Sequence, residues 1–358
     1  MDIKIADESD SKNWDKIVEN SPHGTIFHNW KWLKIVEKHT KTEFYPLIAL
    51  KGNNILGIFP FFHKKTFFNS LFSPPPHAMI PYLGPVIVDY ENAAQDKKES
   101  RLIEFQTSID EFISQNIKPK YLMIMPTPFL IDSRPFEWAG YQIRERYRYS
   151  VDFSNNSDNQ DQDNVDNIWG RINTKTRQNI RRAERNGLSV EFGNKKEFGL
   201  IYDLIVNRYK DQNKVVGADK KLLLDLYESY SENIKIIVAK YKGSIVSGVI
   251  DIWHKDRALS WIGNPKVEIK GVSVNDALNW ECMKMAHENG LKNYDIAGIA
   301  GNQRLYKFHS KYNPNFSTYF SAVKYSSITS KLAEYSYINL LKPLYSKFKS
   351  KSANKNSS

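Results

Sequence analysis

The pattern of apolar and polar positions occurs twice along this chain. Residues 47–65 and 237–256 each read as an apolar strand, a Lys-Gly turn, a second apolar strand and a His-Lys pair. Two apolar runs joined by a short glycine turn predict a β-hairpin. Aligned by identity, Gly52 corresponds to Gly243, which lies 191 positions further along.

The flanking segments repeat as well. Apolar residues at three- and four-residue spacing predict a helix before each hairpin, over 27–39 and 220–231, and another after it, over 99–115 and 275–288. A short strand led by a tyrosine follows each of the later helices. The order helix, hairpin, helix, strand therefore predicts two related α/β domains, which we expect over 1–150 and 169–316.

Between these domains, residues 151–168 are predicted to form a polar linker or loop. The run SNNSDNQDQDNVDN at 154–167 is acidic and has no apolar periodicity. A length of 358 residues agrees with two domains.

Composition excludes several classes of protein. The chain is 41% hydrophobic, which is enough for packed cores and unlike a disordered protein. No signal peptide and no apolar run long enough to span a membrane is visible, so we expect a cytoplasmic protein. The single cysteine, Cys282, excludes an intramolecular disulfide. The histidines show no recognised metal-ligand spacing, and nucleotide-binding and hydrolase motifs are missing, so no metal site is predicted.

The formal net charge of +11 favours anionic partners, such as phosphorylated substrates, nucleic acid or an anionic membrane face. Six cations against one acid fall in the run 169–186, whose apolar spacing predicts a helix that ends at Gly187. Arg177 and Arg181 lie one turn apart, so their guanidinium groups can bind one phosphate or pyrophosphate, with Lys175 beside them. A solvated basic face is the alternative.

A second basic region lies at the C-terminus. Apolar residues from Leu332 to Phe348 are interspersed with lysines and predict an amphipathic helix, which Pro343 interrupts. Such a segment can lie on an anionic membrane or pack on its own protein. The sequence leaves both open, including a position at the inner face of the membrane.

Several stretches are similar to one protein family. In order along the chain, these stretches are SPHGTIFHNWKWLKIV near the start, the first hairpin, YLGPVIV, the join GYQIRERYRYSVDF with the basic helix, and YDIAG followed by YKFHSKYNP. Together they resemble the FemAB-type aminoacyltransferases and their BioF2-like acetyltransferase relatives. The resemblance covers nearly the whole chain. It implies an α/β fold of two tandem GNAT-like acyltransferase domains, with 317–358 packing back on the first domain.

The resemblance also implies N-acyl transfer, in which an amine attacks an activated carbonyl carried by aminoacyl-tRNA or acyl-CoA as co-substrate, with no tightly bound cofactor. The family motif places a lysine directly after the phenylalanine that corresponds to Phe308. This chain has His309 there, so His309, Lys307 or Lys311 is the candidate oxyanion donor. His309 with an ordinary pKa near 6.5 would make activity depend on pH in the neutral range.

Three further regions complete the candidate site. Asp295, in the YDIAG strand, could orient the amine or simply bind local backbone donors. Tyr147 and Tyr149, at the join of the two copies, are candidates for substrate binding or for packing. Gly271 and Ser273 weakly resemble a phosphate loop for coenzyme A, with Ser273 as a helix cap the alternative.

The sequence therefore favours a transferase that moves an aminoacyl or acyl group to an amine of a phosphorylated cell-envelope precursor, of which a lipid-linked one is one form, as in cell wall biogenesis. A non-catalytic nucleic-acid-binding protein that uses 169–186 is the contrasting hypothesis, and a peripheral membrane protein is a third. Oligomeric state and host are open.

Overall fold

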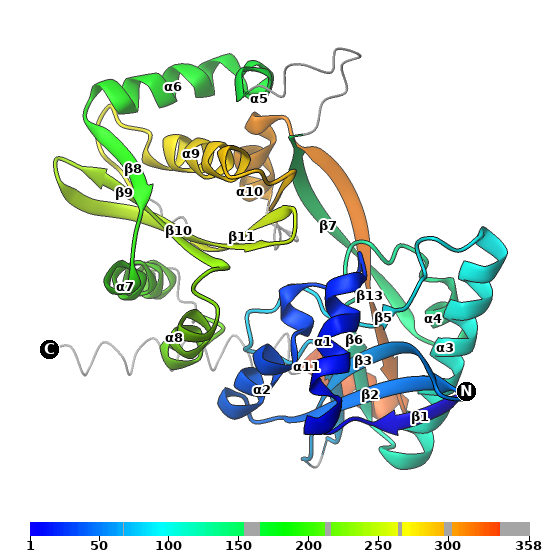
Figure 1. Cartoon of the computed structure of the whole chain (residues 1–358). Helices are drawn as coiled ribbons and strands as arrows, with labels where there is room; N and C mark the ends of the chain where they lie inside the picture. Colours follow the sequence, from blue (N-terminus) through cyan, green and yellow to red (C-terminus); the bar gives the residue numbers. More distant parts are fainter. Residues whose placement is uncertain (67, 154–164, 212–215, 264–266, 297–302, 337–358) are drawn as a thin grey trace, which may run out of the picture. The chain divides into compact units, whose positions relative to one another are not determined.

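The structure is a computed structural model that describes residues 1–66, 68–153, 165–211, 216–263, 267–296 and 303–336. These residues fall into two compact units, which Figure 1 shows in sequence colours. Unit 1 comprises Met1–Arg146, Gly217–Leu222 and, among the described C-terminal residues, 318–336. Unit 2 comprises the described parts of Tyr147–Val216 and Leu223–Ser317.

Unit 1 contains a mixed sheet with helices on both faces. Helix α3 packs against the two N-terminal strands of the sheet, and α1 and α2 pack against its hairpin. The elements of unit 1 are β1 (Asp2–Ile5), η1 (Glu8–Asp10), α1 (Ser11–Asn20), η2 (Ile26–His28), α2 (Trp30–His39), β2 (Glu43–Lys51), β3 (Asn54–Lys64), β4 (Ser70–Ser73), β5 (Val86–Ile87), α3 (Gln95–Asn116), β6 (Tyr121–Ile124), α4 (Arg134–Trp138), β13 (Asn315–Tyr325, from Thr318) and α11 (Ile328–Ser336).

The core under α3 explains one glycine of the repeated hairpin. Phe59 and Phe61 of β3 stack with ring centroids 4.1 Å apart, and Phe105 of α3 packs beside them. A Cβ atom on Gly57 would lie 2.7 Å from the ring of Phe105. Only glycine therefore allows α3 to approach β3 this closely.

Unit 2 has α6 and α9 over one face of its sheet and α7 over the other (Figure 1). Apolar side chains from the strands and from both layers of helices fill the two interfaces. The elements of unit 2 are β7 (Gln142–Asp152, from Tyr147), α5 (Val165–Arg171), α6 (Thr174–Arg185), β8 (Leu188–Phe192), α7 (Lys195–Asp211), α8 (Lys220–Ser229, from Leu223), β9 (Ile234–Tyr241), β10 (Ser244–His254), β11 (Arg257–Gly263), α9 (Val274–Glu288), β12 (Asn293–Ile296), α10 (Gln303–His309), η3 (Ser310–Tyr312) and the first residues of β13.

The two units have the same strand order. Unit 1 runs β1-β2-β3-β4-β6-β13 and unit 2 runs β8-β9-β10-β11-β12-β7. In both, the fourth and fifth strands are parallel and the other neighbours are antiparallel. Tyr121 begins β6, and Tyr294 is the second residue of the corresponding β12. The prediction of two related α/β domains is confirmed.

The residue-level alignment of the two hairpins is wrong by one position. Leu47 pairs with Phe59 in the first hairpin, and Ile237 pairs with Val249 in the second. These pairs are 190 positions apart, whereas the identity-based alignment gave 191. Because side chains alternate between the faces of a sheet, a slip of one residue would turn the core side chains to the wrong face.

The turns show the same shift. Gly52 is the first residue of its two-residue turn, with φ of 59°, whereas Gly243 is the second residue of its turn, with φ of 80°. Lys242 occupies the place of Gly52 and has a left-handed φ of 51°. Both hairpins therefore require left-handed backbone, but their glycines are not equivalent.

Other predictions concern the joins. Residues 154–164 lie outside the described residues, while Val165 begins helix α5, so the predicted linker ends earlier than residue 168. The basic run 169–186 is not one helix, because the Asn173 side chain accepts from the Lys175 N–H (3.0 Å) and starts α6 anew. Residues 337–358 lie outside the described part, and none of the described helices is long and apolar enough to cross a membrane.

Candidate functional site

Helix α6 presents a basic face on unit 2. Thr176, Ile180 and Ala183 are buried at helical spacing against α9, which leaves the rest of the helix surface to polar residues. Lys175 and Arg181 are exposed, and Arg177 is half-buried. Gly187, with φ of 86°, follows the helix as the sequence predicted.

The cations of α6 have neutral neighbours. Arg177 donates to the Thr174 hydroxyl (3.3 Å), and the guanidinium of Arg181 lies 5.3 Å from the ring centre of Trp169. Arg182 donates to the Asn179 side chain (3.2 Å). Among the residues that the structure describes, no carboxylate forms an ion pair with any of these arginines. Their charge is therefore available to an external anion.

A buried ion pair stands next to this helix. The Lys311 ammonium donates to Asp276 Oδ1 (2.6 Å), and Asn179 of α6 donates to Asp276 Oδ2 (3.1 Å). The Lys311 carbonyl also accepts from the Asn173 N–H (2.9 Å). Lys311 is thus held by α9 and α6 together, and its charge is already paired.

His309 lies at the end of α10 in a buried position, 9% exposed. Desolvation, followed by the positive charge of Lys311, lowers the pKa of His309 to about 4. The ring is therefore neutral at pH 7, and the titration near pH 6.5 expected from the sequence does not apply to this environment. Its Nδ1 atom is buried and has no hydrogen-bond partner in the described residues. Lys307, on the same helix, is exposed.

Asp295 lies on the opposite face of the sheet from Tyr294. Its two carboxylate oxygens are held by Arg148 (3.0 Å) and Arg257 (3.3 Å), and its side chain is 4% exposed. Asp295 pairs with Ser150 on β7 and with Leu259 on β11, so each arginine is a diagonal neighbour two residues away. This geometry fits a carboxylate that positions the two arginines.

The tyrosines of the join alternate with Arg148 along β7. Tyr147 stacks on Phe316 (5.7 Å), and Tyr149 meets Phe316 and Tyr306 edge-on (6.0 and 5.7 Å). Phe316 is 57% exposed, so the array reaches the surface of unit 2. The Tyr306 hydroxyl is buried and lacks a partner among the described residues. This array can stack against a planar or apolar substrate group.

The proposed phosphate loop has one clear structural feature. Gly271 takes a left-handed φ of 78°, and its carbonyl accepts from the Asn186 side chain (3.1 Å) at the end of α6. Ser273 occupies the N-cap position of α9, although its hydroxyl makes no capping hydrogen bond. The loop therefore joins the N-terminus of α9 to the C-terminus of α6.

Sequence reasoning missed a buried polar group in the core of unit 2. Asp251 of β10 is fully buried and accepts from the Tyr294 hydroxyl (2.9 Å). Desolvation raises the pKa of Asp251 to about 8, so the carboxyl stays protonated in the folded protein near neutral pH. The signal was present as a lone acid in the apolar strand SGVIDIWH. Asp276 was missed as well, because its partner Lys311 is distant in sequence.

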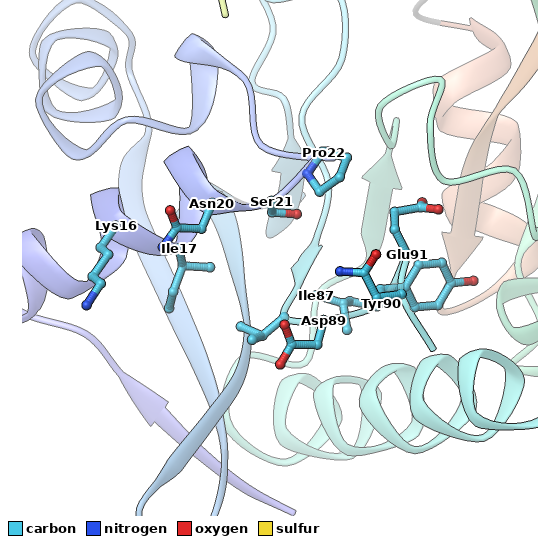
Figure 2. Close-up of a pocket in the computed structure, with 11 residues that line it drawn as sticks. Lys16, Ile17, Asn20, Ser21, Pro22, Ile87, Asp89, Tyr90 and Glu91 are labelled. Atoms are coloured by element: carbon cyan, nitrogen blue, oxygen red, sulfur yellow. The ribbon is translucent and has the colours of Figure 1, made fainter. Parts of the chain in front are cut away.

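A pocket of about 210 Å³, open to solvent, lies in unit 1 (Figure 2). Lys16 and Asn20 of α1 line one side, and Asp89 and Glu91 line the other (Figure 2). It contains none of the residues that the sequence singled out, and its acids disfavour an anionic ligand. Within the described residues, no group of three or more His, Cys, Asp or Glu side chains could hold a metal ion.

The candidate site therefore belongs to unit 2 and consists of the α6 cations, the Lys311–Asp276 pair, His309 and the aromatic array. These groups can bind a phosphorylated molecule and offer a neutral imidazole and a paired ammonium near α6. Asp295 lies on one face of the sheet, and Tyr147 and Tyr149 lie on the other.

Comparisons with known proteins identify similar domains and folds. Residues 173–312 match the model of the acetyltransferase (GNAT) domain. The fold resembles the crystal structure of FemX, with a TM-score of 0.64 at 14% identity over 90% of this chain and 97% of that one. L-PGS from Bacillus licheniformis gives a TM-score of 0.51 at 13% identity over 92% and 98%.

A third structure, the C-terminal domain of a protein assigned as a lysylphosphatidylglycerol synthetase from Agrobacterium fabrum, gives 0.53 at 13% identity over 91% and 94%. No curated protein sequence matches the chain. The family model covers α6, α9, β12 and α10, which carry the α6 cations, Asp276, Asp295 and His309, but not β7 with Tyr147 and Tyr149. Residues 173–312 are therefore similar to the acetyltransferase (GNAT) domain, and the chain as a whole has a fold like that of FemX.

Proposed function

We propose that this acyltransferase moves an aminoacyl or acyl group from aminoacyl-tRNA or acyl-CoA to an amine of a phosphorylated, lipid-linked or soluble, cell-envelope precursor. The observation that supports the phosphorylated acceptor is the face of α6, where Arg177 and Arg181 have no carboxylate partner among the described residues. The likeness to FemX and to a lysylphosphatidylglycerol synthetase supports the envelope as the setting.

The reaction needs three contributions from the protein. The amine nitrogen attacks the carbonyl carbon, the ester or thioester bond breaks, and the amine loses a proton that the leaving group or water takes up. Binding must orient the amine and the carbonyl, and a donor must stabilise the oxyanion. His309 can donate an N–H while neutral, and the ammonium of the Lys311–Asp276 pair is a second candidate donor.

Replacing His309 with alanine should lower the turnover number by roughly 10²–10³-fold, as expected for the loss of one oxyanion donor. His309→Gln keeps a neutral N–H donor and should recover part of the rate. Because the pKa of His309 is about 4, the wild-type rate should show no step from this residue between pH 5 and 8. Steady-state rates across this pH range provide the measurement.

Lys307→Ala serves as the control. Lys307 is exposed on the same helix, so its substitution removes a positive charge without altering the buried surroundings of His309. A loss of rate in Lys307→Ala with no loss in His309→Ala would transfer the donor role to Lys307. A clear step near pH 6.5 that His309→Gln abolishes would show that the ring titrates in the working enzyme.

The proposal as a whole is tested by mass spectrometry of the purified protein for a retained ligand, followed by transfer assays with acetyl-CoA and with aminoacyl-tRNA. Amide product from either donor is the expected result. Binding of RNA with a steep salt dependence and no turnover would instead support the non-catalytic nucleic-acid-binding alternative, because phosphate contacts release counterions.

A further inference from the structure

Lys311 is held both by its backbone and by its ammonium. The ammonium donates to Asp276 Oδ1 (2.6 Å) and lies 4.4 Å from the ring centre of Phe308. The Lys311 carbonyl accepts from the Asn173 N–H (2.9 Å), at the start of α6. Because lysine has a flexible four-carbon stem, contacts at both ends of the residue restrict where its charge can lie.

The carboxylate that binds Lys311 is buried and is itself fixed. The Asp276 side chain is 8% exposed, and its second oxygen, Oδ2, accepts from the Asn179 amide (3.1 Å). The Asp276 carbonyl accepts from the buried Tyr312 hydroxyl (3.1 Å). Asp276 also lies in the first turn of α9, where the helix dipole favours a negative charge. The direction of the Lys311 ammonium is therefore set by a carboxylate that is fixed to α9.

Asn179 connects this carboxylate to the basic face of α6. Its carbonyl oxygen accepts from Arg182 (3.2 Å), while its amide donates to Asp276. A carboxylate only accepts and a guanidinium only donates, so this orientation of the Asn179 amide satisfies both neighbours. A continuous chain of side-chain hydrogen bonds therefore runs from a cation of α6 to the Lys311 ammonium.

The Lys311 ammonium can also reach an external molecule. The Lys311 side chain is 31% exposed, and the contact with Asp276 uses one of the three N–H groups. No second acceptor for the ammonium lies among the residues that the structure describes. The Phe308 ring that contacts the ammonium also meets the His309 ring edge-on, with 5.0 Å between ring centres. The two candidate donors are therefore neighbours.

A partly buried ion pair contributes little to stability by itself, because desolvation of the two charges offsets their attraction. We propose that Asp276 is a positioning residue, which holds the Lys311 ammonium at a fixed place relative to the anion-binding face of α6 through Asn179. When the acceptor phosphate is on α6, Lys311 donates a hydrogen bond to the carbonyl oxygen as that oxygen becomes negative, and it keeps its proton throughout. This inference rests on the proposed acyl transfer and assigns to Asp276 a role that acts through Lys311.

Replacing Asp276 with asparagine keeps a hydrogen-bond acceptor and removes the charge. The turnover number should fall on the order of a hundredfold, the cost of misplacing a group by about 1 Å, while KM for the acceptor changes little. Asp276→Glu restores the charge and should recover part of the rate. In a Lys311→Met background, Asp276→Asn should have no further effect on the turnover number, because its effect passes through Lys311.

Asp256→Asn provides the matched control. Asp256 forms another Asp–Lys pair of unit 2, at the surface, where its side chain is 49% exposed and lies 3.9 Å from Lys292. Its substitution should leave the turnover number and KM like those of the wild type. Thermal unfolding of each variant shows that the rates refer to folded protein, and where Asp276→Asn does not fold, Asp276→Glu and Asn179→Ala take its place in the comparison.

A second measurement follows Lys311 without any transfer reaction. Brief treatment of the full-length protein with acetic anhydride, followed by peptide mass spectrometry, gives the acetylation rate of each lysine. In Asp276→Asn, Lys311 should react several-fold faster relative to the exposed Lys307, because the carboxylate no longer holds the ammonium. Asn179→Ala should raise the same rate to a smaller extent, because Asp276 then loses the donor that fixes its second oxygen.

These measurements separate the inference from the proposed function. If the wild type transferred no acyl group from either donor, the proposed function would fail, and the acetylation rates would still show whether Asp276 holds Lys311. Equal losses of turnover from Asp276→Asn in the wild-type and Lys311→Met backgrounds would overturn the positioning role, because the carboxylate would then act on folding or on another group. An unchanged acetylation rate of Lys311 in Asp276→Asn would overturn it as well.

Discussion

Replacing both Arg177 and Arg181 with glutamine is expected to weaken the binding of a phosphorylated acceptor by about a hundredfold or more. Hydrogen bonds to charged groups contribute about 1.5–3 kcal/mol each, and two such bonds to one pyrophosphate correspond to this loss. Both side chains point away from the buried stripe of α6, so folding should change little. Calorimetric titration with inorganic pyrophosphate measures the affinity directly.

A matched variant separates this local effect from the general charge of the chain. Lys196→Gln combined with Lys242→Gln also removes two positive charges from exposed positions of unit 2, neither of them on α6. This control should retain most of the affinity. Equal losses of affinity in both variants would mean that pyrophosphate binding depends only on the net charge of the protein. Unchanged affinity in the arginine variant would mean that the α6 arginines are solvated and do not bind the anion.

The second large effect concerns the stability of unit 2 as a function of pH. The pKa of Asp251 is raised from 3.8 to about 8 by desolvation, so the folded protein holds a proton that the unfolded chain releases. The contribution of this proton to the free energy of unfolding is fully present below pH 4 and is lost progressively as the pH rises to about 8. Across this window the loss is on the order of 5 kcal/mol, since one pKa unit corresponds to about 1.4 kcal/mol.

Asp251→Asn should remove this dependence, because the amide is neutral at every pH and can accept from the Tyr294 hydroxyl in the same way. The variant should therefore melt at a higher temperature than the wild type at pH 8 and at nearly the same temperature at pH 4. Thermal unfolding at several pH values gives the comparison. Other groups contribute equally to both proteins, so the difference between the two curves isolates Asp251.

Asp256→Asn is the control, because this carboxylate, two residues after β10, is 49% exposed and lies 3.9 Å from Lys292. Its melting curve should follow that of the wild type across the range. If Asp251→Asn were no more stable than the wild type at pH 8, the carboxyl would have to be ionised and solvated in the folded state.

Much of the fold could be predicted from the chain because its elements depend on local patterns. Apolar alternation with a short turn predicted both hairpins, and helical spacing predicted α3 and α9 to within a few residues. Repetition of the same order of elements predicted two related units. Motif order predicted GNAT-like domains, and residues 173–312 match the acetyltransferase (GNAT) domain.

The site was predicted less completely, because its contacts join residues distant in sequence. Lys311 was a candidate oxyanion donor in the sequence, but its partner Asp276 lies on α9, 35 residues earlier. His309 was expected to titrate near pH 6.5, yet burial lowers its pKa to about 4. Neither the ion pair nor the desolvation can be inferred from neighbouring residues.

The sequence by itself determined the elements, the duplication and the concentration of arginines on α6, because periodicity, turn residues and charge act over a few positions. Only the tertiary structure decided the register of the duplication, since the packing of α3 and α9 fixes which face of each hairpin is buried. Only the tertiary structure decided that Asp295 is bound by two arginines. These features depend on hydrogen bonds and burial between segments that meet only in the folded chain.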